Sequence, residues 1–179
     1  MSNLIKVSID DQIKNYRDDL INECLVNRVL DPTIIDGSNN YFVDSKHTKT
    51  LYDVLINVCS KYFNFTIKDN DFKLWCYYSD DKFNGAKWHN HINTCTINAV
   101  LYLKIPKDNK GIDFRHNDKI INCKPKPGDL IIFPNFLDHY AYPSHDEPRI
   151  SLNLELRCHE DSNDIFNNLK VKPWHQDKR

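Results

Sequence analysis

The hydrophobic period of the chain changes near residue 65, and this change constrains the fold more than any other feature. Before it, in segments 10–30 and 48–63, apolar residues recur at three- and four-residue steps, the spacing of one helix face. After it, the chain breaks into short apolar and aromatic runs separated by turn residues. Helices followed by strands favour an α+β fold, with the helices packed on one side of a β core.

The helical part has recognisable ends. Pro32 should stop the first helix, because proline disfavours helical geometry in the residue before it. Thr48 is the expected N-cap of the second helix. Near the C-terminus, Ile165, Phe166 and Leu169 predict one further short helix.

Six segments of the second part are expected to form strands. In the last of them, one isoleucine and three leucines alternate with Ser151, Asn153 and Glu155. This period of two predicts one inward and one outward face. Many short strands joined by turns such as 126–129 favour a sandwich or barrel of the jelly-roll kind over a parallel sheet. The six segments are 72–78, 94–105, 112–114, 120–123, 130–133 and 149–156.

Length and composition are typical of one domain without a general polyanion-binding surface. The chain has 179 residues and a formal net charge of -1, so nucleic acid and anionic membranes are not expected partners. We expect helical support over 1–63, a β core over 64–157 and a C-terminal tail over 158–179. No apolar run approaches the roughly 20 residues that cross a bilayer, and the N-terminus lacks the apolar core of a signal peptide. The six cysteines show no Cys-x-x-Cys pair, so reduced thiols and a cytoplasmic location are expected.

Three histidines are candidates for a metal site. In an extended segment, residues two apart project to the same face, so His89 and His91 can point at one centre. His139 follows the apolar strand 130–133 and stands at a strand end. Three ligands on one side of an ion leave the other side open, which is the arrangement of non-haem Fe(II) oxygenases. A His-x-His pair alone is weak support, because the chain has eight histidines.

The order of three motifs carries the interpretation further. Segment 88–94 reads WHNHINT, segment 125–139 reads PKPGDLIIFPNFLDH, and ten residues later the chain continues with Arg149-Ile-Ser151. With these motifs, residues 75–156 resemble the 2-oxoglutarate- and Fe(II)-dependent oxygenases, particularly short phage and bacterial members and more distantly the prolyl hydroxylases. The resemblance implies a double-stranded β-helix (a jelly-roll or cupin-like core). It also implies the cofactor Fe(II), 2-oxoglutarate as cosubstrate and O2. The expected cytoplasmic location includes that of a virus-infected host cell.

The resemblance also implies roles for residues beyond the histidines. Arg149 and Ser151 match the family positions that hold the far carboxylate of 2-oxoglutarate, and an arginine supplies a permanently charged, bidentate fork. Tyr102 matches a position that often assists this carboxylate, whereas Tyr78 and Asn98 match weaker lining positions. For Tyr102, Tyr78 and Asn98 ordinary packing is about as good an explanation. For Arg149 the alternative is a surface ion pair with an acidic neighbour, Glu147 or Asp146.

The metal motif departs from the family pattern, which is His-x-Asp or His-x-Glu. This chain offers His89-Asn90-His91 or, in the next frame, His91-Ile92-Asn93, and neither frame contains a carboxylate. We favour His89, His91 and His139 as ligands, because histidine binds iron better than asparagine does. Asp80 and Asp81 are the candidates for a missing carboxylate, whereas His116 and His145 are expected to be surface residues or substrate contacts.

These residues predict an enzyme that hydroxylates a peptidyl residue or a small metabolite while 2-oxoglutarate is decarboxylated to succinate. Two alternatives stay open: a three-histidine cupin-type dioxygenase that needs no oxo acid, and a non-catalytic jelly-roll binding module. The candidates for the substrate side are the aromatic residues Trp75, Tyr77, Trp88 and Phe136. Neither the substrate nor the oligomeric state follows from the sequence.

Overall fold

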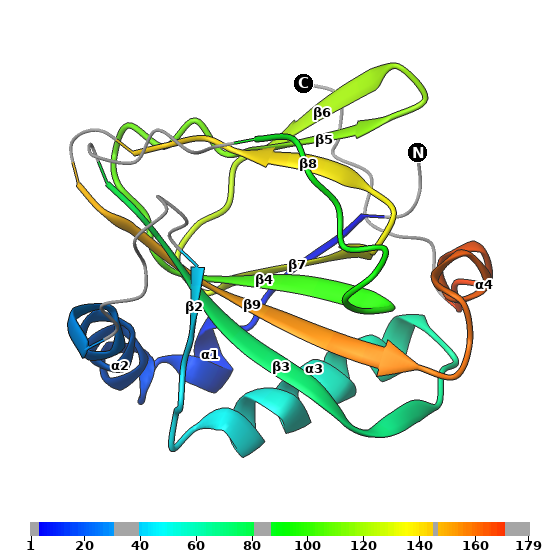
Figure 1. Ribbon diagram of the computed structural model, residues 1–179, viewed down its shortest axis with the longest axis horizontal. Coiled ribbons are helices and arrows are strands. Elements are labelled where there is room, and N and C mark those ends of the chain that lie inside the picture. The colour runs from blue at the N-terminus through cyan, green and yellow to red at the C-terminus, as the bar shows by residue number, and fades with distance from the viewer. Residues whose placement is uncertain (1–3, 31–39, 81–86, 145–146, 171–179) are drawn as a thin grey trace.

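Two antiparallel sheets form the body of the protein, which is described here from a computed structural model over residues 4–30, 40–80, 87–144 and 147–170. The larger sheet has the order β1-β7-β4-β9-β3-β2 and the smaller one the order β6-β5-β8 (Figure 1). Every strand pair is antiparallel. The strands are β1 (Ile5–Ser8), β2 (Asn40–Phe42), β3 (Ile67–Ser79), β4 (Ile97–Lys104), β5 (Ile112–His116), β6 (Lys119–Cys123), β7 (Asp129–Pro134), β8 (Asp138–Ala141) and β9 (Arg149–Cys158).

The helices lie in two places: the first three on the side of the larger sheet that faces away from the smaller sheet, and the last at one end of the larger sheet, near β7 (Figure 1). They are α1 (Asp10–Ile13), α2 (Arg17–Leu30), α3 (Thr48–Tyr62) and α4 (Ser162–Asn167). The segment expected as one helix over 10–30 is thus divided at residues 14–16. Thr48 is the first helical residue rather than the cap: its hydroxyl donates to the Ser45 carbonyl, and no side chain caps this end.

Both faces of the larger sheet are buried. Leu101, Leu152 and Leu154 belong to the apolar core under the helices, whereas Val100, Tyr102 and Phe133 pack between the two sheets. The expected α+β fold with a double-stranded β-helix and helices on one side is therefore confirmed. The prediction that one face of the last strand points outward is wrong, because its polar residues lie between the sheets, with Ser151 and Glu155 buried.

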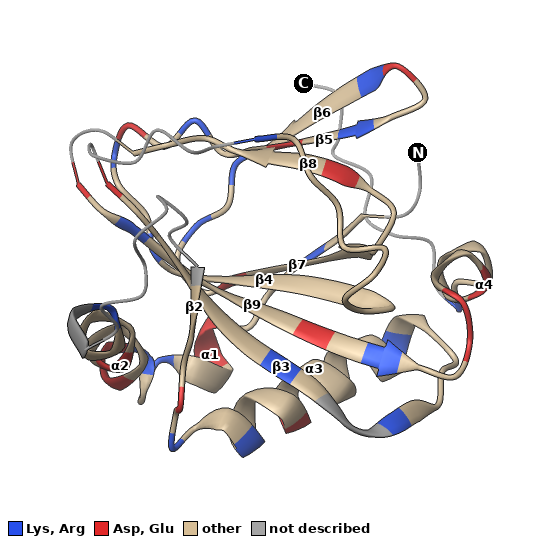
Figure 2. Ribbon diagram, in the orientation of Figure 1, with Lys and Arg blue, Asp and Glu red and all other residues tan. Residues whose placement is uncertain are grey.

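Three short strands were not expected from the sequence: β1, β2 and β8. β1 and β2 close the two edges of the larger sheet, and β8 completes the smaller one. Acidic and basic residues both occur on the helices and on the strands, without separation into two regions (Figure 2). In the described part of the chain, no helix is both long and apolar enough to cross a membrane.

Candidate metal centre and cosubstrate pocket

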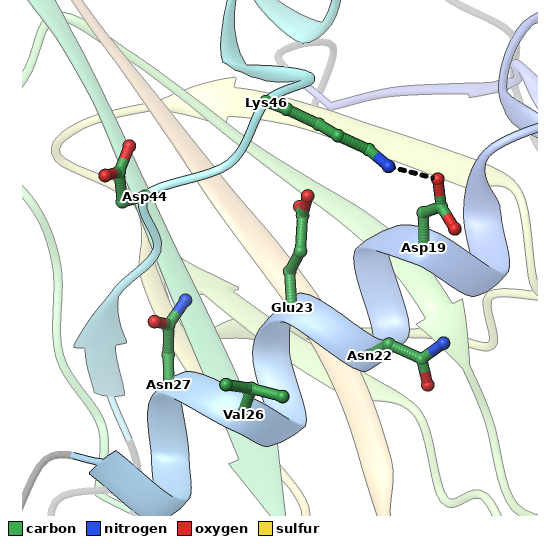
Figure 3. A pocket seen from close by; sticks show the side chains of 7 residues that line it. All are labelled: Asp19, Asn22, Glu23, Val26, Asn27, Asp44 and Lys46. Atoms are coloured by element: carbon green, nitrogen blue, oxygen red, sulfur yellow. Dashed lines mark ion pairs between the residues drawn. The ribbon is translucent and has the colours of Figure 1, made fainter.

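The helical layer carries an acidic surface pocket that is separate from the histidines. It has an empty volume of about 600 Å³, and α2 contributes most of its lining, including Glu23 (Figure 3). Asp19 in this pocket is already paired with Lys46 at 2.7 Å. Its other lining residues are Asn22, Val26, Asn27 and Asp44. None of the site residues expected from the sequence lies here, so this pocket is not the predicted centre.

Backbone pairing brings His89 and His139 together. The two residues form an antiparallel bridge, in which each amide donates to the other's carbonyl at 3.1 and 2.9 Å. Residues paired in this way present neighbouring side chains on one face. Their ring centroids are 4.2 Å apart.

Asn135, in the turn between β7 and β8, holds the segment that carries His91. The Asn135 carbonyl accepts the amide N–H of His91 at 2.7 Å, and its side-chain amide donates to the Cys95 carbonyl at 2.8 Å. Asn90 points elsewhere and donates to Asp138 at 3.0 Å. The alternation along the segment therefore sends His89 and His91 to one side and Asn90 to the other.

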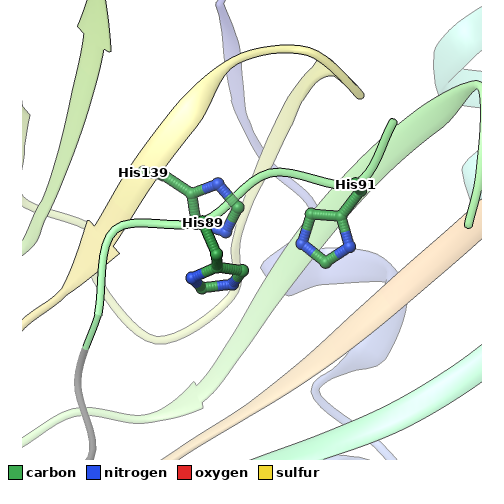
Figure 4. A group of neighbouring side chains, drawn as sticks. All are labelled: His89, His91 and His139. Atoms are coloured by element: carbon green, nitrogen blue, oxygen red, sulfur yellow. The ribbon is translucent and has the colours of Figure 1, made fainter. Parts of the chain in front are cut away.

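Three imidazoles converge as a result (Figure 4). The ring centroid of His91 lies 5.4 Å from that of His89 and 5.1 Å from that of His139. One nitrogen from each ring lies within 4.8 Å of the others, a spacing that could hold one metal ion. His89 is exposed, His91 half-buried and His139 buried. Asn93, the ligand in the alternative frame, is exposed in the following turn.

The hydrogen-bond partners indicate which nitrogen of each ring is available to an ion. Nδ1 of His89 lies 2.9 Å from the Lys87 carbonyl, and Nδ1 of His139 lies 3.2 Å from the Leu137 carbonyl. A carbonyl can only accept, so both Nδ1 atoms carry the proton and both Nε2 atoms have a free lone pair. Nε2 of His91 is buried without a hydrogen-bond partner among the described residues. An unpartnered buried nitrogen of this kind fits a metal ligand.

The electrostatics keep two of these rings neutral, which metal binding requires. Burial, reinforced by the neighbouring rings of His89 and His91, lowers the pKa of His139 to about 3. Burial also lowers the pKa of His89 below its usual value. Both side chains are therefore in the form that binds a divalent ion near neutral pH.

The same histidines border a pocket that ends at a buried arginine. The pocket has an empty volume of about 380 Å³, part of it open to solvent, and is lined by His89 and His139 at one side and by Arg149 and Ser151 on β9. Arg149 is 3% exposed. Its Nε and Nη2 have no hydrogen-bond partner among the described residues, and Nη1 lies 3.5 Å from the Gly111 carbonyl.

The surface ion pair considered for Arg149 does not form with Glu147, since no ion pair of the described residues includes Arg149. Asp146, the other candidate partner, lies outside the described residues. A buried guanidinium without an anion is costly. The pocket therefore has the chemistry to bind a carboxylate at its inner end.

The remaining cosubstrate candidates divide between the two faces of the sheet. Tyr102 lines the pocket and is buried. Tyr78 lies on the opposite face, in the core under the helices, with the Arg28 guanidinium 3.8 Å from its ring centroid. Its neighbour Tyr77 lines the pocket instead, and Cζ of Arg149 lies 5.2 Å from the centroid of its ring. Asn98 does not line the pocket but is fully buried, and neither atom of its amide group has a partner among the described residues.

The carboxylate near the histidines is not the one that was expected. Asp80 lies 3.6 Å from Arg28 in an ion pair with α2, and Asp81 lies outside the described residues. Instead, Glu155 on β9 places Oε1 3.0 Å from Nδ1 of His91. The sequence carried a signal for this residue, because Glu155 shares the strand face of Arg149 and Ser151.

The other candidates are not among the residues that line the pocket. Trp88 stacks against Arg115, whose guanidinium is 4.6 Å from its ring centroid, beside Tyr140. Trp75 stacks on Phe42 at the sheet edge. Phe136 contacts His116 on the smaller sheet. His145 lies outside the described residues.

Comparison with known proteins places this architecture in one fold class. Neither the family models nor the curated proteins match the sequence. Among solved structures, the chain is similar to a prolyl-4-hydroxylase from Pseudomonas putida, with 14% identity and a TM-score of 0.63 over 89% of this chain and 95% of that one. HygX from Streptomyces hygroscopicus, crystallised with nickel and 2-oxoglutarate, gives 11% identity and a TM-score of 0.63 over 87% and 83% of the two chains.

A third similar structure is a prolyl hydroxylase from Trichoplax adhaerens, solved in complex with a peptide fragment of the hypoxia-inducible factor. It is 15% identical, with a TM-score of 0.57 over 88% of this chain and 84% of that one. At such identities these likenesses show the fold alone. The protein has the double-stranded β-helix fold of the 2-oxoglutarate- and Fe(II)-dependent oxygenases, as the sequence resemblance implied.

Proposed function

We propose that the protein is an Fe(II)- and 2-oxoglutarate-dependent oxygenase that hydroxylates its substrate. The observation that carries the proposal is the pairing of two features in one pocket: a cluster of three histidines and an unpaired buried guanidinium. His89, His91 and His139 would hold the metal through their Nε2 atoms. When bound, Fe(II) and 2-oxoglutarate supply the oxidative chemistry, in which O2 is consumed, 2-oxoglutarate becomes succinate and CO2, and a substrate C–H becomes C–OH.

The protein's own residues would orient the cosubstrate. Arg149 provides two free N–H groups for the far carboxylate, and Ser151 adds a hydroxyl on the same strand face. Tyr77 and Tyr102 line the pocket beside them and would shield this end of it from bulk water. Burial on this scale strengthens the attraction between the guanidinium and a carboxylate, because screening by water is weak there.

Two other functions are less well supported. A three-histidine dioxygenase without an oxo acid would have no use for a buried, unpaired arginine in its pocket. A non-catalytic module would have no reason to keep Nε2 of His91 buried and unpartnered. Both alternatives therefore leave a costly feature without a compensating ligand.

The test is an anaerobic titration of the purified protein with ferrous iron and then 2-oxoglutarate. The proposal predicts a visible metal-to-ligand absorption band that requires both components, followed by succinate formation when O2 is admitted. His139→Ala should abolish both signals, and Lys49→Ala on the exposed side of α3 should change neither. An iron-loaded protein that gives no band at millimolar 2-oxoglutarate would favour the dioxygenase without an oxo acid.

The substrate class is proposed more broadly, as a peptidyl residue or a small molecule that enters beside His89. The half-buried ring of Trp88 and its partners Arg115 and Tyr140 offer a planar, partly charged contact surface next to that histidine. The peptide complex of the Trichoplax adhaerens protein supports a peptide as one candidate. The proposed location is the cytoplasm.

A further inference from the structure

A buried carboxylate lies directly behind one of the three histidines. Oε1 of Glu155 and Nδ1 of His91 are 3.0 Å apart, and the two side chains are 5% and 11% exposed. The Thr94 hydroxyl contacts the same carboxylate oxygen at 3.4 Å. The second oxygen, Oε2, is buried and has no hydrogen-bond partner among the described residues. No lysine or arginine in the described part of the chain pairs with this carboxylate.

This contact sets His91 apart from the other two histidines. Backbone carbonyls, which are neutral, lie next to Nδ1 of His89 and His139. His91 alone among the three has a carboxylate at the equivalent place. A carboxylate that accepts the Nδ1 proton leaves the lone pair on Nε2, fixes the orientation of the ring and makes Nε2 a stronger donor to a metal. Nε2 of His91 is the buried, unpartnered atom that faces the other two rings.

A divalent ion held by three neutral imidazoles would also gain from an anion at this point. Three neutral imidazoles bring no negative charge to a divalent ion, whereas the His-x-Asp and His-x-Glu motifs that this segment resembles bring one. Glu155 lies on β9, opposite Asn98 on β4, and its carboxylate contacts His91. The Glu155 carboxylate therefore lies one imidazole away from the proposed ion site, although the motif itself contains no carboxylate.

A second arrangement of the same residues has to be distinguished. Ligand atoms of His91, Cys95 and Glu155 also lie within 4.8 Å of one another and could hold a separate ion. That ion would take Nδ1 of His91, so it would exclude a proton there. Since Nε2 is the nitrogen left without a partner, the structure favours a protonated Nδ1.

We propose that Glu155 is a positioning residue of the metal centre: its carboxylate accepts the Nδ1 proton of His91, directs Nε2 to the ion and supplies the charge that the motif lacks. This proposal rests on the three-histidine metal site of the proposed function. It does not depend on the cosubstrate, the substrate or turnover.

The experiment measures Co²⁺ affinity by visible absorption under anaerobic conditions, with metal-free wild-type protein and two variants. Glu155→Gln keeps the size of the side chain and removes its charge, and we expect Co²⁺ affinity to fall about 10- to 100-fold. Glu160→Gln is the matched control, because Glu160 is a surface residue whose carboxylate contacts the Thr66 amide. This control should bind Co²⁺ as the wild type does.

A second measurement needs no substitution and so does not depend on the folding of a variant. In Zn²⁺-loaded wild-type protein, ¹H–¹⁵N correlation spectra of the imidazole groups should show His91 bound through Nε2 with a proton on Nδ1. Metal binding through Nδ1 of His91 would overturn the proposal. So would a folded Glu155→Gln protein whose Co²⁺ affinity stays within about twofold of wild type.

Stoichiometry separates the remaining outcomes. One Co²⁺ per chain is expected, whereas a second ion that disappears in Cys95→Ser would assign Glu155 to a separate site and refute its role here. A wild-type protein that binds no Co²⁺ would overturn the metal site itself, and the positioning role with it. That result differs from failure of the present proposal alone, in which the triad binds Co²⁺ and Glu155→Gln has no effect.

Discussion

Replacing Arg149 by methionine should have opposite effects on cosubstrate affinity and on stability. Two N–H groups of the guanidinium are buried and unpartnered, so a carboxylate could accept from both. A hydrogen bond to a charged group contributes about 1.5–3 kcal/mol, so losing two costs roughly 3–6 kcal/mol. At about 1.4 kcal/mol per tenfold change, 2-oxoglutarate should bind roughly 100- to 20,000-fold more weakly.

The metal-free protein should become more stable for the same reason. Without cosubstrate, Arg149 is a buried charge that the described residues do not neutralise, and methionine removes this cost while filling a similar volume. A gain of at least about 1 kcal/mol corresponds to a Tm increase of roughly 2–4 °C for a chain of this size. A site that is destabilising until its ligand binds is a common compromise between stability and activity.

Two measurements check this pair of effects: an anaerobic titration of Fe(II)-loaded protein with 2-oxoglutarate, and thermal unfolding of the metal-free protein. Arg149→Lys should recover part of the affinity, because it keeps the charge but loses the planar fork. Arg17→Met, which breaks a surface pair with Asp10 at 2.7 Å, is the control and should leave cosubstrate affinity unchanged. Unaltered affinity in Arg149→Met, or a clear drop in its Tm, would refute the reasoning.

Three further perturbations probe the site and its support. The pKa of His139 is about 3 in the folded chain and near 6.5 in the unfolded chain, so the unfolded state binds more protons between these pH values. The free energy of unfolding of the metal-free protein, measured with urea, should therefore fall as the pH falls through this window. The loss should be smaller in His139→Gln. Tyr77→Leu should weaken 2-oxoglutarate binding severalfold in a binding titration, whereas Tyr78→Leu, on the other face of β3, should lower stability and leave the affinity of the folded protein unchanged. Gly128→Ala should destabilise by about 1–3 kcal/mol in urea unfolding, because Gly128 has a φ of +85° and a Cβ there would lie 2.6 Å from Asp10; an unchanged midpoint would contradict this.

The elements with a clear period could be predicted from the sequence, and the short edge strands could not. The helical segments and the six longer strand segments follow from apolar spacing alone. β1, β2 and β8 have three or four residues each, too few to show a period. They are strands because longer neighbours pair with them, as β7 pairs with β1. Such pairing is a tertiary effect that local sequence does not contain.

The assignment of Tyr78 to the pocket failed for a related reason. Residues 74–78 of β3 read Leu-Trp-Cys-Tyr-Tyr, so apolar and aromatic residues occupy both faces and no polar face fixes the phase. An error of one residue moves a side chain to the other side of the sheet. β9 illustrates the opposite case: its alternation fixed the phase, but the polar face that was expected to point outward lies between the sheets, where Arg149 and Ser151 line the pocket.

The polar face of β9 carries two charged residues that cannot compensate each other. Arg149 and Glu155 have opposite charges and share one strand face, but six residues at about 3.4 Å each separate them by roughly 20 Å. They are therefore too far apart to neutralise each other, and each must be compensated where it lies. Glu155 has an imidazole of the metal cluster at 3.0 Å, whereas the free N–H groups of Arg149 face a pocket that the other two histidines border. In the proposed function, β9 would carry the carboxylate behind His91 at one end and the guanidinium for the far carboxylate at the other, so the register of β9 would set where Arg149 lies relative to the histidines.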